Sequence, residues 1–277
     1  MTAALQTESE IFAGNRATGH IALTANAKGG RTRRTRVDEA GSLRVRFPNE
    51  PTGVLETVII NNAGGMAGGD HFEIDIALGA GAQVTAGTAS AEKIYRSTGP
   101  DARLGVRLKA GPHAKLAWLP QETILFDNAR LSRHIDIELD STASLVLCEG
   151  MVFGRAAMGE TVGQGCVIDR WRLRRGGKLV FAETARLDGG IDRLLAEPAC
   201  ANGGIALATL LIVPGEEAMT ATIREMEPSF AGEVGVSVWN GIALARFCAR
   251  DGAALRHDII LVLGALDLCA LPRLWLS

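Results

Sequence analysis

A loose internal repeat in the middle of the sequence limits the folds that the chain can adopt. Four segments each combine a strand that ends in leucine, a short turn of small residues and a second strand. The leucines lie about 30 residues apart, at Leu78, Leu108, Leu139 and Leu173. A period of this length with two strands per unit predicts stacked β layers, each burying one face against the next. Ordinary hairpins of similar size in a sandwich are the alternative, and we favour the solenoid-like packing.

The last third of the sequence changes to a mixed pattern. Residues 216–226 place their apolar side chains on one helical face, with acidic residues in the first turn. Two strand-like runs flank Asn240-Gly241, a dipeptide typical of hairpin turns. Residues 252–270 follow with a strongly apolar helical pattern. We therefore predict a mainly β fold of layered, solenoid-like stacked β-sheets, with about two α-helices in the C-terminal third.

No linker rich in proline, serine or charge interrupts the chain, so we predict a single domain over residues 1–277. Its β-rich part covers 20–190 and its mixed α/β part covers 205–277. Near the start, runs flanking Gly29-Gly30 predict a hairpin. The second arm of this hairpin alternates arginine and threonine, which we interpret as a solvated edge strand protected by charge rather than as a basic contact patch.

Four glycines and a closing carboxylate fall together in the run from Gly64 to Asp70. A phosphate-binding loop needs a strand before the glycines and a helix after them. The residues after Asp70 instead alternate between polar and apolar, as a strand does. We therefore interpret Gly64, Gly65, Gly68 and Gly69 as parts of a strained turn or bulge between two strands, where glycine is the residue that fits.

Composition and charge exclude several classes of function. The chain carries 29 Lys and Arg against 31 Asp and Glu, a net charge of −2, which leaves no electrostatic footprint for nucleic acid. It has no run of about 18 uncharged apolar residues and no secretory pattern at its N-terminus. The five cysteines are widely spaced and lack a CxxC pair, which favours reduced thiols over a zinc site. We expect a cytoplasmic protein that binds neither nucleic acid nor membrane.

The sequence contains no evident catalytic constellation. It lacks a GxSxG nucleophile turn, and its five histidines are isolated rather than paired as in a metal cage. Three acidic residues need an explanation, because Glu149 and Glu183 interrupt apolar strands and Asp70 closes the glycine run. They either line a wet cavity that a divalent cation can pass, or act structurally by capping backbone N–H groups or pairing with an arginine such as Arg155 or Arg186. From the residues alone we favour the structural interpretation.

Several motifs occur along the chain in a fixed order. They are NNAGGMAGGD (61–70), EKIYRSTG (92–99), WLPQETILFDNARLSR (118–133), GRAAMGE (154–160) and DRWRLRRGGKLVFAE (169–183). Together they resemble the urease accessory protein UreD family, called UreH in some organisms. The resemblance covers nearly the whole chain. Its motif residues here are Gly64, Gly65, Gly68, Gly69, Lys93, Tyr95, Arg96, Gln121 and Glu122.

The resemblance implies a urease maturation factor without catalytic activity and without a tightly bound cofactor. Its implied partners are the apo-urease subunits, UreF and, through UreF, the GTPase UreG, whose GTP hydrolysis is coupled to nickel insertion into urease. Family members are also proposed to contain an internal passage for nickel ions. Asp70, Glu149 and Glu183 match acidic positions of the family motifs, which makes them candidates for a transient nickel path with no tight site.

Other functions compete with this one. The first alternative is a pure assembly scaffold that never contacts nickel. A freely circulating nickel-binding protein would require tight binding, against which the scattered histidines argue. An enzyme of unknown chemistry would require a pocket of convergent titratable residues.

Overall fold

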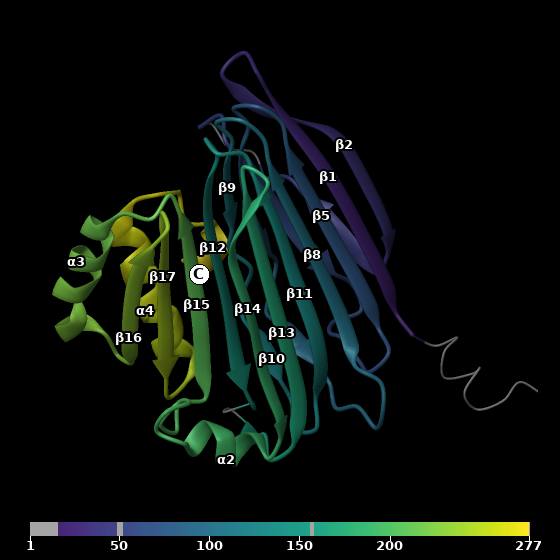
Figure 1. Ribbon diagram of the computed structural model, residues 1–277. Coiled ribbons are helices and arrows are strands. Elements are labelled where there is room, and N and C mark those ends of the chain that lie inside the picture. The colour runs from purple at the N-terminus through teal and green to yellow at the C-terminus, as the bar shows by residue number, and fades with distance from the viewer. Residues whose placement is uncertain (1–15, 49–51, 156–157, 277) are drawn as a thin grey trace, which may run out of the picture.

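The computed structural model describes residues 16–48, 52–155 and 158–276, which form two packed β-sheets and several helices (Figure 1). The first sheet has seven strands, in the spatial order β14 (Lys178–Gly189), β13 (Gly165–Arg175), β11 (Arg130–Leu139), β8 (Ala102–Ala110), β5 (His71–Leu78), β1 (Thr18–Lys28) and β2 (Arg31–Gly41). The second has ten. Eight follow one another in the order β16 (Glu233–Trp239), β17 (Ile242–Ala249), β15 (Ala206–Val213), β12 (Ser144–Phe153), β9 (Lys115–Trp118), β6 (Gln83–Thr88), β4 (Leu55–Asn61) and β3 (Leu43–Arg46). The other two are β10 (Thr123–Leu125), which pairs with β12, and β7 (Glu92–Ile94), which pairs with β10. The helices are α2 (Ile191–Ala196), α3 (Glu217–Glu225) and α4 (Gly252–Leu266), with 3-10 turns η2 (Glu227–Ser229) and η3 (Arg273–Trp275).

Successive strands in the middle of the chain alternate between the two sheets, so that the chain winds in coils. In the first sheet, β5, β8, β11 and β13 pair in parallel with one another. In the second sheet, β4, β6, β9 and β12 do the same. Parallel neighbours that follow each other by one coil are the stacked layers predicted from the repeat, and the predicted mainly β, solenoid-like fold is confirmed.

The leucines that defined the repeat do not lie in a single row. Leu108 is aligned with Ile137 of β11, and Ile137 with Leu173 of β13. Leu78 and Leu139 belong to the neighbouring row, two residues further along the strands. The period of about 30 residues is therefore confirmed, and the four leucines fall in two rows because successive coils differ in length by a few residues.

The apolar side chains divide between the two faces of the second sheet. Its inner face shares one core with the first sheet, which includes Ile74 of β5 and Leu145 of β12. Its outer face is covered by α4, whose Leu255 and Ile259 pack into a second apolar cluster. Strand β12 is thus buried on both faces, which explains its nearly continuous apolar sequence and makes a charged residue within it costly.

The local predictions at the two ends of the chain are confirmed. Strands β1 and β2 form the expected hairpin, and β2 is the outermost strand of its sheet, with exposed arginines. Strands β16 and β17 form the second hairpin. Helix α4 begins after Asp251, whose Oδ1 accepts from the Ala254 N–H at 2.8 Å, and stops at Leu266 because Asp267 turns left-handed with φ of 46°. None of the helices in the described part of the chain is long and apolar enough to cross a membrane.

Candidate functional site

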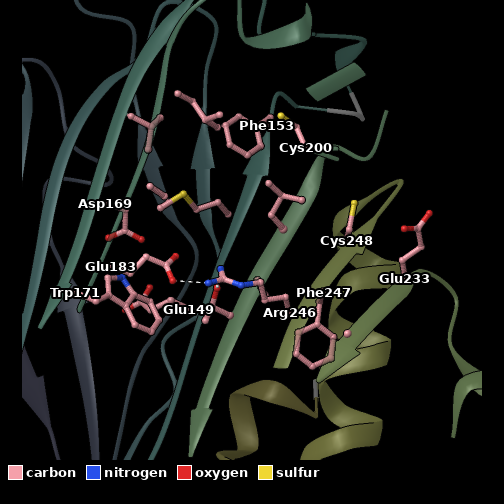
Figure 2. A pocket seen from close by; sticks show the side chains of 18 of the residues that line it. Glu149, Phe153, Asp169, Trp171, Glu183, Cys200, Glu233, Arg246, Phe247 and Cys248 are labelled. Carbon is pink, nitrogen blue, oxygen red and sulfur yellow. Dashed lines mark hydrogen bonds and ion pairs between the residues drawn. The ribbon is translucent and has the colours of Figure 1, made fainter. Parts of the chain in front are cut away.

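A cavity of about 460 Å³ lies between the two sheets at the C-terminal end of the solenoid (Figure 2). Strands β11, β13 and β14 line it from the first sheet, and β12, β15, β17 and β16 line it from the second. Apolar side chains such as Phe153 and Trp171 form part of its wall. Its charged side chains are Arg133, Glu149, Asp169, Glu183, Glu233 and Arg246. The cavity therefore brings together two of the three acidic residues singled out from the sequence, Glu149 and Glu183.

A buried charged cluster forms one wall of this cavity. Arg133 of β11 donates from Nε to Asp169 Oδ1 at 2.9 Å and from Nη2 to Asp169 Oδ2 at 2.6 Å. Its Nη1 donates to Oε2 of Glu149, whose Oε1 accepts from the Trp118 indole N–H at 2.7 Å. The side chains of Arg133 and Glu149 are only 2% and 5% exposed. The cluster thus joins the two sheets, and each carboxylate oxygen in it accepts a hydrogen bond.

The charges of this cluster do not balance, because one guanidinium faces two carboxylates. Burial is the main cause that raises the pKa of Glu149, and the negative charge of Asp169 adds to it, while Arg133 and Trp118 act in the opposite direction. Burial disfavours the charged form of Arg133, but the charges of Asp169 and Glu149 outweigh burial and raise its pKa. Arg133 therefore stays charged, and Glu149 holds a proton more readily than an exposed glutamate does.

Glu183 lines the cavity from β14, the strand next to that of Asp169 and Trp171. Its Oε2 accepts from Nη2 of Arg246 on β17, so this ion pair also joins the two sheets (Figure 2). Arg246 Nη1 donates to Thr209 Oγ1 at 3.3 Å. The side chains of Arg246 and Glu183 are 51% and 30% exposed, so this pair is in contact with solvent, unlike the Arg133 cluster.

Asp70 is not among the residues that line the cavity. Its Oδ1 accepts from the Ala17 N–H at 2.8 Å and its Oδ2 from the Ala67 N–H at 2.7 Å, and its side chain is buried. The carboxylate thereby closes the glycine turn that carries the chain from β4 to β5. Within this turn Gly68 approaches Ser97, and Gly69 takes a φ of 92°. The strand–turn–strand interpretation of the run is confirmed.

The glycine turn packs directly against the EKIYRSTG segment. A Cβ on Gly65 would lie 2.5 Å from Cε2 of Tyr95, and Gly65 has a φ of 152°. The Tyr95 hydroxyl donates to the Gly64 carbonyl at 2.9 Å. The Met66 N–H donates to the Lys93 carbonyl at 2.7 Å, and the Tyr95 N–H donates to the Met66 carbonyl at 2.8 Å. Glycine is needed here because a tyrosine ring lies against the backbone.

Lys93 and Arg96 belong to the same segment and have exposed side chains. Arg96 forms an isolated antiparallel bridge with Ala129. Lys93 lines a smaller cavity of about 180 Å³ with Glu92 and Asn61. The first two motifs of the chain therefore meet each other at this rim of the solenoid and do not line the large cavity.

Gln121 and Glu122 hold the C-terminal segment in place. Arg256 of α4 donates from Nε to Glu122 Oε1 at 3.0 Å, and its Nη2 donates to Gln121 Oε1. Gln121 Nε2 in turn donates to the Leu274 carbonyl at 3.1 Å. The Trp275 indole N–H donates to the Leu119 carbonyl at 2.9 Å. The LPQE motif is thus the anchor for α4 and for the tail that follows it.

Replacing Arg256 by methionine should lower the free energy of unfolding by about 2 kcal/mol, because the charge-assisted bonds to Gln121 and Glu122 are lost. Urea denaturation measures the change. Arg224→Met, at an exposed arginine of α3, serves as the matched control and should stay within about 0.5 kcal/mol of the parent. Equal effects of the two substitutions would contradict the anchoring role.

Sequence reasoning missed the partners of the acidic residues. The suggested pairing with Arg155 or Arg186 is wrong, since Arg155 pairs with Glu160 and Arg186 with Asp188. A signal for the true partners does exist. In β11 every second residue is buried, and Arg133 occupies one of these otherwise apolar positions. Asp169 occupies a buried position of the same kind in β13. A charged residue on the inward face of an alternating strand needs a buried partner.

Metal-ligating side chains do not cluster in the part of the chain that the structure describes. Within the ranges 16–48, 52–155 and 158–276, no three His, Cys, Asp or Glu side chains come close enough together to hold a metal ion. All five cysteines lie in these ranges and are free, and burial raises the pKa of the Cys148 thiol. The arrangement offers carboxylates that face a cavity and are held by arginines.

Comparison with known proteins identifies the family of the chain. The model of the UreD urease accessory protein family matches residues 17–276. The chain belongs to the UreD family. It is 59% identical over 267 residues to the urease accessory protein UreD of Rhodopseudomonas palustris (strain BisB18), which covers 96% of each chain. It is 55% identical over 277 residues to the urease accessory protein UreD of Bradyrhizobium diazoefficiens, which covers 100% of each chain. The resemblance inferred from the motifs is confirmed.

Proposed function

We propose that the chain acts in urease maturation as a non-catalytic scaffold that binds apo-urease together with UreF and, through UreF, the GTPase UreG. In this role it supports GTP-dependent insertion of nickel into the urease active site. Membership of the UreD family supports the role in urease maturation. The cavity between the sheets, lined by Glu149 and Glu183, supports the further proposal that nickel passes through this chain.

The chemistry of the cavity suits an ion in transit. Carboxylate oxygens bind divalent cations, and two free cysteines, Cys200 and Cys248, also line the cavity as softer ligands. A protein that hands an ion onward must bind it weakly, because a tight site would retain it. Glu149 and Glu183 already accept hydrogen bonds from Arg133 and Arg246, so a cation has to compete with these arginines for the oxygens. In this proposal the ion is cargo, and the chain holds no cofactor tightly.

The alternative is a pure assembly scaffold that never contacts nickel. The observation in its favour is that Asp70, Glu149 and Glu183 all have hydrogen-bond partners within the chain. For Asp70 these are two backbone N–H groups of the glycine turn and its flank, which explains the carboxylate without any ion. Nickel contact at Asp70 is therefore the part of the proposal that most needs a direct test.

Amide substitutions separate the two candidates. Glu149→Gln and Glu183→Gln should leave assembly with UreF, UreG and apo-urease intact, but lower the nickel content of the matured urease by about tenfold, the scale of losing a metal-contacting group. Pull-down measures assembly, and elemental analysis of the purified urease measures nickel. Asp70→Asn is included to test the turn carboxylate.

Asp188→Asn is the matched control, because Asp188 is an exposed carboxylate of β14 that pairs with Arg186 and does not line the cavity. It should change neither assembly nor nickel content. Full nickel loading in the Glu149 and Glu183 variants would rule out the ion path and leave the scaffold alternative. Loss of assembly in the same variants would show that these residues act through the fold.

A further inference from the structure

The charged side chains that line the cavity follow a common pattern. Of its four carboxylates, Glu149 and Asp169 are held by Arg133, and Glu183 is held by Arg246. The fourth, Glu233, lies at the β16 side and is 3.4 Å from Nδ2 of Asn202. Four carboxylates against two guanidiniums leave the cavity anionic, yet three of the four carry an arginine on their oxygens.

An arginine that is paired with a carboxylate of the cavity differs from other possible partners of that carboxylate in its charge and in its shape. Its guanidinium stays charged at every pH that the folded protein tolerates, and it presents several N–H donors in a fixed plane. Arg133 occupies both oxygens of Asp169 and one of Glu149. A divalent cation that approaches these carboxylates therefore meets a fixed positive charge and oxygens that are already engaged.

A contribution to fold stability does not explain the ion pair between Arg246 and Glu183. Arg246 and Glu183 are 51% and 30% exposed, and ion pairs with this degree of exposure contribute on the order of 0–1 kcal/mol. The pair nevertheless crosses from β14 to β17 at the cavity wall (Figure 2). Its position suggests a role in the chemistry of the cavity rather than in holding the sheets together.

We propose that Arg246 and Arg133 are resident counter-ions that set the affinity of the cavity for divalent cations. Each arginine lies on carboxylate oxygens that would otherwise bind the ion, so that the ion is held weakly and released. The inference rests on the proposed function, since it concerns the same cavity. It assigns to the two arginines a positioning role that is separate from the carboxylates themselves.

Removing an arginine while keeping the carboxylates should raise the affinity of the cavity for Ni²⁺, so that the ion is retained. In the full-length, untagged chain, Arg246→Met should bind Ni²⁺ at least tenfold more tightly than the parent, measured by isothermal titration calorimetry. The double variant Arg246→Met/Glu183→Gln should return to the parent affinity. In maturation assays, Arg246→Met should lower the nickel content of urease, because the ion stays on the accessory chain.

Arg186→Met is the matched control, because the substitution removes an exposed arginine from an ion pair on β14, the strand of Glu183, outside the cavity lining. It should leave Ni²⁺ affinity unchanged. Arg133→Met extends the test to the buried cluster, with circular dichroism to establish that the chain is folded. Arg246 comes first because its partly exposed position makes loss of folding the smaller risk.

The result that overturns the inference is an unchanged Ni²⁺ affinity in Arg246→Met, or a tighter affinity that persists in the double variant. This failure is distinguishable from failure of the proposed function. If the arginine variants bind Ni²⁺ with unchanged affinity and the Glu149 and Glu183 amide variants lose nickel in urease, the counter-ion role is refuted and the proposed passage of nickel through the chain is kept. If Arg246→Met binds Ni²⁺ tightly and the amide variants still load urease fully with nickel, the counter-ion role is kept and the passage of nickel through the chain is refuted.

Discussion

Arg133→Met should lower the free energy of unfolding by about 3–5 kcal/mol, the cost of leaving buried charges without their partner. Arg133 is 2% exposed and is the cation that faces both Glu149 and Asp169. Without it, two carboxylates are left in the wall of the cavity with only the Trp118 N–H as a donor from the same cluster. Denaturation in urea at neutral pH measures the loss.

Two comparisons distinguish the loss of charge from the loss of side-chain volume. The triple variant Arg133→Met/Glu149→Gln/Asp169→Asn removes all three charges, and most of the stability should return. Lowering the pH should also help the single variant, because burial raises the folded-state pKa of Glu149 and the variant lacks the arginine that opposes this shift. The neutral form stabilises the fold below the unfolded pKa, and this stabilisation is lost as the pH rises through the folded pKa. A free energy of unfolding of Arg133→Met within about 1 kcal/mol of the parent at neutral pH would contradict a stabilising role of the Arg133 cluster between the two sheets.

Glu92→Gln should make the stability of the protein less dependent on pH. Burial raises the pKa of Glu92 to about 7, and the charge of Asp70 adds to the effect, while the Asn61 amide opposes it by donating to Oε1 at 2.9 Å. Since the folded pKa lies above the ordinary value of 4.5, the neutral form stabilises the fold. That stabilisation is complete below about pH 4.5 and is lost as the pH rises through about 7.

The difference between the variant and the parent should therefore grow in favour of the variant from about pH 4.5 to about pH 7 and level off at higher pH. The shift corresponds to at most about 3 kcal/mol, and contact of Glu92 with the small cavity beside the glycine turn reduces this figure. Urea denaturation at about pH 5 and at about pH 8, on either side of most of this window, checks the prediction. Glu138→Gln is the control, because Glu138 forms an exposed pair with Lys109 and is 58% exposed. Parallel pH profiles of Glu92→Gln and the parent would contradict the assignment.

The parts of the fold that were predictable from sequence depend on local patterns. Two hairpins, the glycine turn and α3 each follow from residues within about a dozen positions of one another, and all four form as expected. The coil period was also predictable, since it reflects the length of one turn of the chain. The register was not, because a shift of two residues keeps every side chain on the same face and leaves no trace in the pattern.

The site was predictable only in part, and for the same reason. Glu149 and Glu183 stand out because each interrupts an apolar strand. Their partners come from the facing sheet: Arg133 is 16 residues from Glu149, and Arg246 is 63 residues from Glu183. Which arginine meets which carboxylate depends on how the two sheets face each other. Asp70 could be a ligand or a turn cap by sequence, and only its two backbone contacts at 2.8 and 2.7 Å identify the cap.

The anchoring of the C-terminal tail by the LPQE motif has a consequence for how the chain matures on the ribosome. The Trp275 indole and the Leu119 carbonyl that it contacts are 156 residues apart. At about 5–20 residues per second, the LPQE segment waits roughly 8–30 seconds after its synthesis before its partner is made. Throughout that interval the outer apolar face of the second sheet, including Leu119 and Cys148, lacks the helix and tail that finally cover it. The nascent chain therefore presents a binding surface for general chaperones that the finished protein does not have.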